Sequence, residues 1–140
     1  MKIHIINGPN LNLLGKREEA IYGNISFDDY LLDLKKKYSN VEFVYYQSNI
    51  EGGLINYLQE HGFDGNSVVL NAGGYTHTSI ALSDTIAAIS NNVIEVHISN
   101  IYSREKYRQH SLLSKNCVAV IAGLGLPGYD VAIDYFLRNK

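Results

Sequence analysis

Short apolar runs alternate with amphipathic segments along the whole of this 140-residue chain, and this alternation restricts its fold more than any other feature. The runs have the length of strands, and several are apolar throughout, as expected for strands covered on both faces of a sheet. Segments of helical spacing separate them, so the strands can be joined by the crossover connections that parallel pairing requires. We predict strands at residues 3–7, 41–47, 67–71, 93–98 and 118–122.

The intervening segments predict helices. In the first of them, apolar residues recur at helical spacing after Ser26, which suits an N-cap because Asp29 follows three residues on. We expect helices at residues 27–38, 54–61, 82–89 and 129–137, and a shorter one at 104–114. Strands and helices in alternation predict a doubly wound α/β fold, with a flavodoxin-like five-stranded parallel sheet and helices on both faces. The length suits one hydrophobic core, so we expect residues 1–140 to form a single domain.

Charge and composition exclude several classes of partner. The formal net charge of −2 gives no basic face for nucleic acid, and the one dense cationic run ends a predicted helix, where it complements the helix dipole. No apolar run approaches the ~20 residues of a membrane span, and polar residues interrupt the first apolar run, so we expect a cytoplasmic protein without membrane partners. Cys117 is the single cysteine and cannot form an internal disulfide, so we expect a buried, inert thiol. No cluster of His, Cys and Asp has metal-ligand spacing.

Ligands of doubly wound sheets bind beyond the carboxyl ends of the strands, so the segments that follow the strands are candidate sites. Residues 7–23 follow the first strand and have neither helical nor strand period, although they contain three Asn, an Arg and a Tyr. Long irregular loops in small domains are usually functional. Within this loop, Arg17 and Tyr22 together suggest a phenol whose proton a neighbouring cation makes removable.

Residues 71–79 follow the third strand and contain paired glycines, which let a backbone approach a ligand closely. Thr78 or Ser79 can cap the helix that comes next. His77 is the one histidine in the segment. A tight strand-to-helix turn with a surface histidine remains an equal alternative for this segment taken alone.

The fourth predicted strand places Glu95, His97 and Ser99 on one face, because side chains alternate along a strand. A carboxylate two residues from an imidazole can fix its tautomer and favour the imidazolium, which suits a general acid. A purely structural pair of histidine and glutamate remains the alternative. Arg104 and Arg108 stand four apart on the next predicted helix, where they could attract an anionic or hydroxylated substrate or could form a solvated helix face.

Taken together, these blocks resemble the type II 3-dehydroquinate dehydratases. The likeness spans essentially the whole chain and rests on residues 7–17 with 22–23, 71–77, 95–100, 104–108, and 121–125 with 128–129. It implies a single catalytic domain that dehydrates 3-dehydroquinate to 3-dehydroshikimate through an enolate, without metal or organic cofactor. The reaction would serve the shikimate pathway or quinate catabolism, and the chain would form trimers that assemble into a dodecamer.

The resemblance also implies roles for single residues. Tyr22, as tyrosinate, would remove a proton beside the ketone, and His97 would protonate the leaving hydroxyl. Asn10 would hold a water at the enolate oxygen, and Arg17 and Arg104 would lower the tyrosine pKa. Glu95 would support the histidine.

For substrate binding, the resemblance implies two groups of residues. Asn71 and the backbone N–H groups of Ile98 and Ser99 would bind the carboxylate and the tertiary hydroxyl. His77, Arg108 and a neighbouring subunit's Asp84 would bind the ring hydroxyls. Spacing alone would instead pair Arg104 and Arg108 with the carboxylate.

The chain departs from the family in the loop before the tyrosine. Members commonly have Arg-Glu-Pro there, whereas this chain has Arg17, Glu18, Glu19 and Ala20. The missing proline removes a restraint on φ, and the added carboxylate lies near the cation that would activate Tyr22. This departure leaves open a family member that has lost activity. A flavodoxin-like or receiver-like binding module is the other alternative, but such modules carry a Ser/Thr-rich phosphate loop or acidic residues after the first strand, where this chain has Asn-Gly-Pro-Asn.

Overall fold

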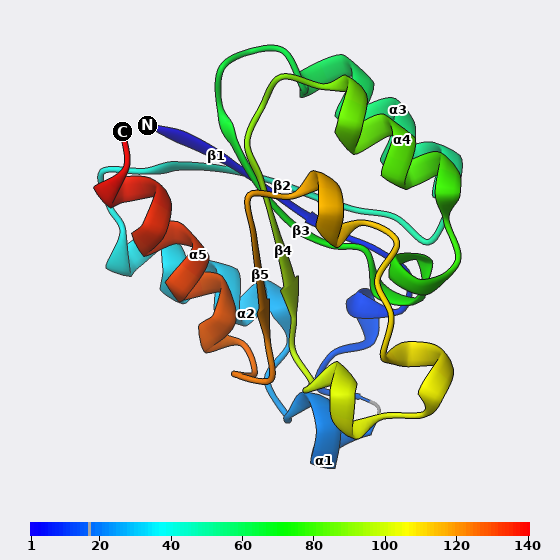
Figure 1. The fold of residues 1–140 in the computed structure, drawn as a ribbon. Helices are drawn as coiled ribbons and strands as arrows, with labels where there is room; N and C mark the ends of the chain where they lie inside the picture. Colours follow the sequence, from blue (N-terminus) through cyan, green and yellow to red (C-terminus); the bar gives the residue numbers. More distant parts are fainter. Residues whose placement is uncertain (17) are drawn as a thin grey trace.

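Five parallel strands form one sheet in the computed structural model, which describes residues 1–16 and 18–140, without the side chains of Glu19 and Tyr22 (Figure 1). They are β1 (Lys2–Asn7), β2 (Glu42–Gln47), β3 (Ser67–Asn71), β4 (Val93–His97) and β5 (Ala119–Ala122). Their order is β2-β1-β3-β4-β5, and all neighbouring pairs are parallel. Because this is the strand order of flavodoxin, the predicted doubly wound fold is confirmed.

Helices cover both faces of the sheet. Figure 1 shows α2 (Phe27–Lys37) and α5 (Pro127–Arg138) on one face, and α3 (Glu51–His61) and α4 (Ile80–Ala88) on the other. Each pair packs on the strands through its own cluster of buried apolar side chains. A short helix, α1 (Glu19–Tyr22), lies at the carboxyl end of the sheet. Of the helices in the described part of the chain, none combines the length and the apolar character that crossing a bilayer requires.

The predicted caps explain where two helices begin. Ser26 precedes α2, and its Oγ accepts a hydrogen bond from the backbone N–H of Asp29 at 3.2 Å. Ser79 precedes α4 and accepts from the N–H of Leu82 at 2.9 Å, so Ser79 and not Thr78 is the cap. Such caps satisfy N–H groups that the first helical turn leaves without partners.

The predicted helix at 104–114 is wrong. Short 3₁₀ turns replace it, at Ile101–Ser103, Lys106–Arg108 and Ser114–Asn116. Side chains in this region take the backbone groups that a helix would use: the Gln109 amide donates to the carbonyls of Tyr102 and Arg104, and the Ser111 hydroxyl accepts from the N–H groups of Leu113 and Ser114. Local bonds of this kind compete with helix formation.

A glycine and an asparagine bring the loop after β1 against the end of β3. The N–H of Gly8 donates to the carbonyl of Asn71 at 2.7 Å, and a Cβ on Gly8 would lie 2.3 Å from the carbonyl oxygen of Ala72. Asn10 adopts φ 68°, a left-handed conformation that asparagine tolerates better than most residues. The Asn-Gly-Pro-Asn sequence therefore fixes the approach of this loop to the third strand.

Candidate active site

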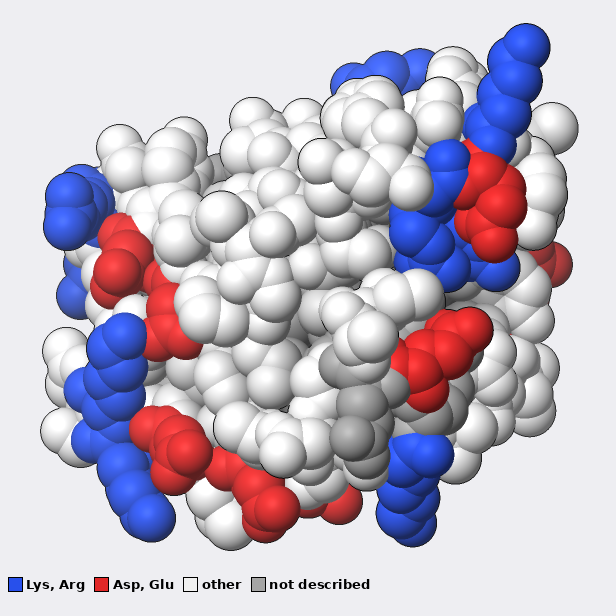
Figure 2. Space-filling view, turned by 90° about the horizontal axis from the view of Figure 1, so that it is seen from below, with Lys and Arg blue, Asp and Glu red and all other residues white. Residues whose placement is uncertain are grey.

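A cavity of about 190 Å³ opens at the carboxyl ends of β1, β3 and β4. The strand order reverses between β1 and β3, which is where doubly wound folds bind ligands. Its volume is below the about 300–1,000 Å³ of sites for drug-sized ligands, so it suits a small metabolite. Figure 2 views this end of the molecule and shows one group of blue Lys and Arg side chains around red acidic atoms at the upper right, and further side chains of both charges along the left edge and at the bottom.

Most of the residues that the sequence singled out line this cavity, although they come from distant segments. The loop after β1 contributes Asn10, the end of β3 and the segment after it contribute Asn71 and His77, and the end of β4 and the segment after it contribute His97, Ile98, Ser99, Arg104 and Arg108. Glu95 is fully buried behind His97. Asp84 is exposed on α4 and is not among the residues that line the cavity. Arg17 lies outside the described residues, as does the side chain of Tyr22.

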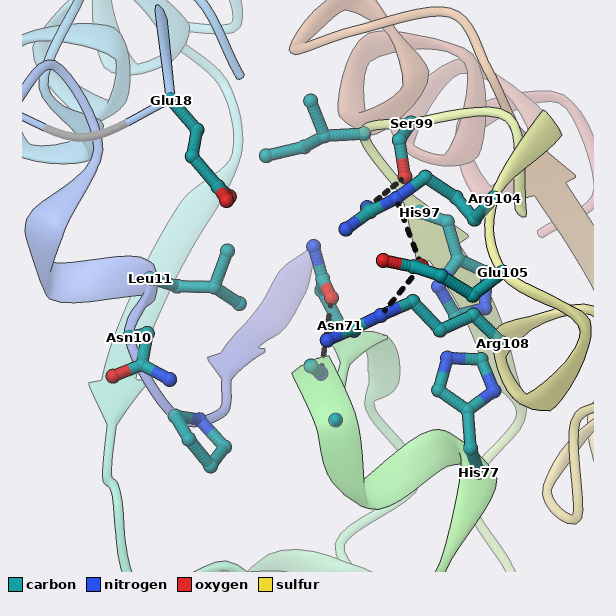
Figure 3. Close-up of a pocket in the computed structure, with 14 residues that line it drawn as sticks. Asn10, Leu11, Glu18, Asn71, His77, His97, Ser99, Arg104, Glu105 and Arg108 are labelled. Atoms are coloured by element: carbon teal, nitrogen blue, oxygen red, sulfur yellow. Dashed lines mark hydrogen bonds and ion pairs between the residues drawn. The ribbon is translucent and has the colours of Figure 1, made fainter. Parts of the chain in front are cut away.

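The helix that carries Tyr22 lies close to the same strand ends. Ala20 and Ile21 of α1 line a wider neighbouring cavity together with Ser99 and Arg104. The carboxylate of Glu18, just before α1, points into the first cavity from the side opposite Arg104 (Figure 3). Sequence reasoning treated Glu18 only as part of the altered block, although its position next to Arg17 was a signal for a site residue.

Glu95 and His97 contact each other, as the alternation of side chains along the predicted strand indicated. Nε2 of His97 lies 2.6 Å from Oε2 of Glu95, and the side chains are 6% and 0% exposed. Because a carboxylate can only accept, Nε2 carries the proton of this bond, and Nδ1 is left as the nitrogen that can exchange a proton with a molecule in the cavity. This arrangement suits a general acid.

His77 bonds to the protein through its other ring nitrogen, Nδ1, whereas His97 uses Nε2. Its Nδ1 donates to the carbonyl of His110 at 2.8 Å, because a carbonyl can only accept. Burial lowers the pKa of His77, and the nearby His97 and Arg108 lower it further, against the bond to His110. The ring is therefore neutral near pH 7, and Nε2 can accept a hydrogen bond from a hydroxyl group. The rings of His77 and His97 stack with centroids 6.4 Å apart.

The two arginines reach the cavity from separate turns and not from one helical face, which corrects the expectation for Arg104 and Arg108. Glu105 lies between them, with its Oε2 3.1 Å from Nε of Arg108 and 3.7 Å from Nε of Arg104 (Figure 3). A bond from its own backbone N–H and these two cations lower the pKa of Glu105. Nη1 of Arg104 also donates to Oγ of Ser99 at 3.1 Å. One carboxylate thus holds two guanidinium groups at one wall.

Buried hydrogen bonds fix the amide of Asn71. Its Oδ1 accepts from the N–H of Gly73 at 3.2 Å, and its Nδ2 donates to the hydroxyl of Tyr129 at 3.1 Å. That hydroxyl donates onward to Oδ1 of Asn7 at 2.7 Å, and burial raises the pKa of Tyr129, so the phenol stays neutral. Since an amide NH₂ group has two donors, one N–H of Asn71 remains for a ligand.

Two serines that the sequence did not single out complete the site behind the cavity. Oγ of Ser111 donates to Oε1 of Glu95 at 2.9 Å, and Oγ of Ser114 donates to Oε2 at 3.0 Å. They lie 16 and 19 residues beyond Glu95 in a segment without regular period, so only the fold brings them to the carboxylate. Sequence spacing carried no signal for them.

Cys117 is half-buried and lies behind the site. Its Sγ lies 3.4 Å from the carbonyl of Leu113, and burial together with the charge of Glu95 raises the pKa of the thiol to about 12. The prediction of an inert thiol agrees with this raised pKa, since the thiolate is the reactive form. Among the described residues there is no group of three or more His, Cys, Asp or Glu side chains placed to hold a metal ion.

Comparison with known proteins finds dehydroquinases that match nearly the full length of the chain. Residues 1–137 match the family model of dehydroquinase class II. The 3-dehydroquinate dehydratase of Fusobacterium nucleatum is 49% identical over 145 residues, covering 99% of this chain and 97% of that protein. The 3-dehydroquinate dehydratase of an Exiguobacterium species is 48% identical over 140 residues, covering 99% of this chain and 96% of that protein.

Solved structures agree as well. The type II dehydroquinase from Butyrivibrio crossotus superposes with a TM-score of 0.90 at 47% identity, covering 96% of each chain. The type II dehydroquinase from Propionibacterium acnes superposes with a TM-score of 0.92 at 36% identity, covering 96% of this chain and 94% of that one. Sequence and fold therefore agree from end to end, and the chain belongs to the dehydroquinase class II family of enzymes.

Proposed function

We propose that this chain removes water from 3-dehydroquinate to give 3-dehydroshikimate, in the shikimate pathway or in quinate catabolism. The observation that carries the proposal is the buried pair of Glu95 and His97, with His97 at the wall of a cavity that also presents Asn71 and two guanidinium groups. Such a cavity combines an acid with partners for the carboxylate and hydroxyl groups of a small polyol acid. The family membership supports the same reaction.

The reaction needs one base and one acid. The base removes a proton from the carbon beside the ketone, and the electron pair of that C–H bond forms an enolate. The C–O bond on the next carbon then breaks, and the hydroxyl leaves as water once the acid has protonated it. We assign Tyr22, as tyrosinate, to the first step and His97 to the second, because Nδ1 of His97 is the ring nitrogen left for the cavity. No metal, organic cofactor or Schiff base takes part.

Supporting roles follow the family resemblance. Arg17 and Arg104 favour the tyrosinate, and the position of Arg104 beside α1 supports its share of this role. Asn10 holds a water at the enolate oxygen, and it lines the cavity on the side of the β1 loop (Figure 3).

Substrate groups are divided between two walls. Asn71 and the N–H groups of Ile98 and Ser99 bind the carboxylate and the tertiary hydroxyl, which fits the N–H that Asn71 has left to donate. Arg108 and His77 bind ring hydroxyls, and the neutral His77 can accept from one of them. The spacing of the two arginines in the sequence suggests an alternative, in which Arg104 and Arg108 both bind the carboxylate of the substrate.

The direct test is to add 3-dehydroquinate to the purified protein and follow the ultraviolet absorbance of the conjugated product. We expect absorbance to rise with enzyme concentration. Quinate is the matched control, since it lacks the ketone that makes the proton removable and should give no signal. Borohydride added with substrate should leave activity intact because no imine forms. Folded protein that leaves 3-dehydroquinate unchanged would contradict the proposal and favour a binding module or an inactive family member.

We also propose that the chain forms trimers assembled into a dodecamer, in which Asp84 completes the site of a neighbouring subunit. The exposure of Asp84, away from the cavity of its own subunit, supports this placement. Size-exclusion chromatography with light scattering should give a dodecamer, and Asp84→Asn should weaken substrate binding. A stable monomer with full activity would contradict the assembly.

A further inference from the structure

The carboxylate of Glu95 is fully buried, yet each of its oxygens has a donor. His97 Nε2 and Ser114 Oγ bond to Oε2 at 2.6 and 3.0 Å, and Ser111 Oγ bonds to Oε1 at 2.9 Å. A buried carboxylate without such donors would take up a proton, because burial disfavours the charged form. The two serines therefore supply the local solvation that keeps Glu95 ionised.

The Ser111 hydroxyl can act only as a donor toward Glu95. Its oxygen accepts from the N–H groups of Leu113 and Ser114 at 3.1 and 3.2 Å. A hydroxyl has two acceptor lone pairs and one proton, so the lone pairs are in use and the proton must lie on the bond to Oε1 of Glu95. Oε1 cannot carry a proton of its own without losing this partner.

Where the proton of this pair resides decides whether His97 can act as an acid. The imidazolium carries protons on both nitrogens and readily gives up the one on Nδ1. If Glu95 took the Nε2 proton instead, the ring would be neutral, and a neutral imidazole is a very weak acid. A donor on the far oxygen of Glu95 bonds to the carboxylate form, and this bond favours the arrangement in which the shared proton stays on His97.

We propose that Ser111 is a positioning residue for the dehydration step, holding Glu95 as a carboxylate so that His97 keeps the proton that it gives to the leaving hydroxyl. This inference rests on the proposed function. Ser111 does not line the cavity, so it should act on the rate of the chemical step and not on substrate binding. Ser114 donates to Oε2 of Glu95, the oxygen that His97 also contacts. In the described part of the chain no N–H group donates to the Ser114 hydroxyl as Leu113 and Ser114 do to that of Ser111, so Ser114 holds the carboxylate less strictly.

The test is to compare Ser111→Ala with the wild-type enzyme in steady-state kinetics. A hydrogen bond to a charged group contributes about 1.5–3 kcal/mol, so kcat should fall about 10- to 160-fold while KM stays unchanged. Ser111→Thr, which keeps a hydroxyl, should restore most of the rate. The ratio of α-proton exchange with deuterated water to dehydration should rise in Ser111→Ala, because enolate formation does not use His97.

The matched control is Ser83→Ala. Oγ of Ser83 donates to the carbonyl of Leu112 at 2.7 Å and accepts from the Asn116 amide at 3.0 Å, so it anchors the same segment without touching Glu95. If Ser111 only anchored this segment, both alanine variants would lose exchange and dehydration equally, which would overturn the inference.

Should Ser111→Ala fail to fold, Ser111→Cys carries the test, with an intermediate kcat expected because a thiol is a weaker donor than a hydroxyl. An inactive wild-type enzyme would refute the proposed function itself, whereas an active wild type with an unchanged Ser111→Ala refutes only this inference.

Discussion

Replacing His97 with asparagine is expected to lower the kcat for dehydration about 10³-fold, the middle of the range for loss of a general acid. His97 is the cavity-lining partner of Glu95, and its ring is the group placed to protonate the leaving hydroxyl. Asparagine is the informative replacement because it is polar, carries no ionisable group and is smaller than the histidine ring, while Glu95 keeps its hydrogen bonds from Ser111 and Ser114. The fold should therefore survive while the acid is lost.

Steady-state kinetics with 3-dehydroquinate measures this effect, and a thermal melt checks the fold. His110→Asn is the matched control, because the side chain of His110 is exposed and only its backbone carbonyl contacts the site, through His77. It should leave kcat near the wild-type value. A His97→Asn variant with more than a tenth of wild-type activity would contradict the role of His97 as the acid.

Features that depend on neighbours in the sequence could be predicted. The five strands came from apolar runs, and the caps at Ser26 and Ser79 came from residues within three positions of the bonds that they make. The pairing of Glu95 with His97 has the same local origin, because alternation along one strand places both side chains on one face. The meeting of separate loops at one cavity could also be predicted, because the carboxyl ends of parallel strands lie at the same edge of the sheet.

Features that depend on tertiary contacts could not be predicted. Arg104 and Arg108 do meet at the cavity, but on two short turns, because Gln109 and Ser111 take the backbone groups that a helix needs. The bond of Tyr129 to Asn71 crosses 58 residues, and no local spacing indicates it. Burial of the Glu95 carboxylate creates the need for donors, yet only the folded chain shows that Ser111 and Ser114 meet it.

Replacing Tyr22 with phenylalanine is expected to lower kcat for dehydration by about 10³-fold or more, because phenylalanine has no oxygen to take the proton. A free tyrosine has a pKa near 10, so a tyrosinate at pH 7 needs about 4 kcal/mol of stabilisation of the anion. One cation at ~4 Å supplies on the order of that amount at an effective dielectric constant near 20, before burial subtracts from it. Arg17 and Arg104 together are a reasonable requirement for this step.

Deuterium exchange separates the two steps that Tyr22 and His97 perform. In deuterated water, His97→Asn should still exchange the proton beside the ketone of 3-dehydroquinate, because the enolate forms and returns without loss of the hydroxyl. Tyr22→Phe should stop both exchange and dehydration, since no enolate forms. Tyr102→Phe, a change on an exposed ring close to Arg104, is the control and should alter neither rate. If Tyr22→Phe kept exchanging the proton, another group would be the base, and the part of the mechanism that depends on the loop after β1 would be wrong.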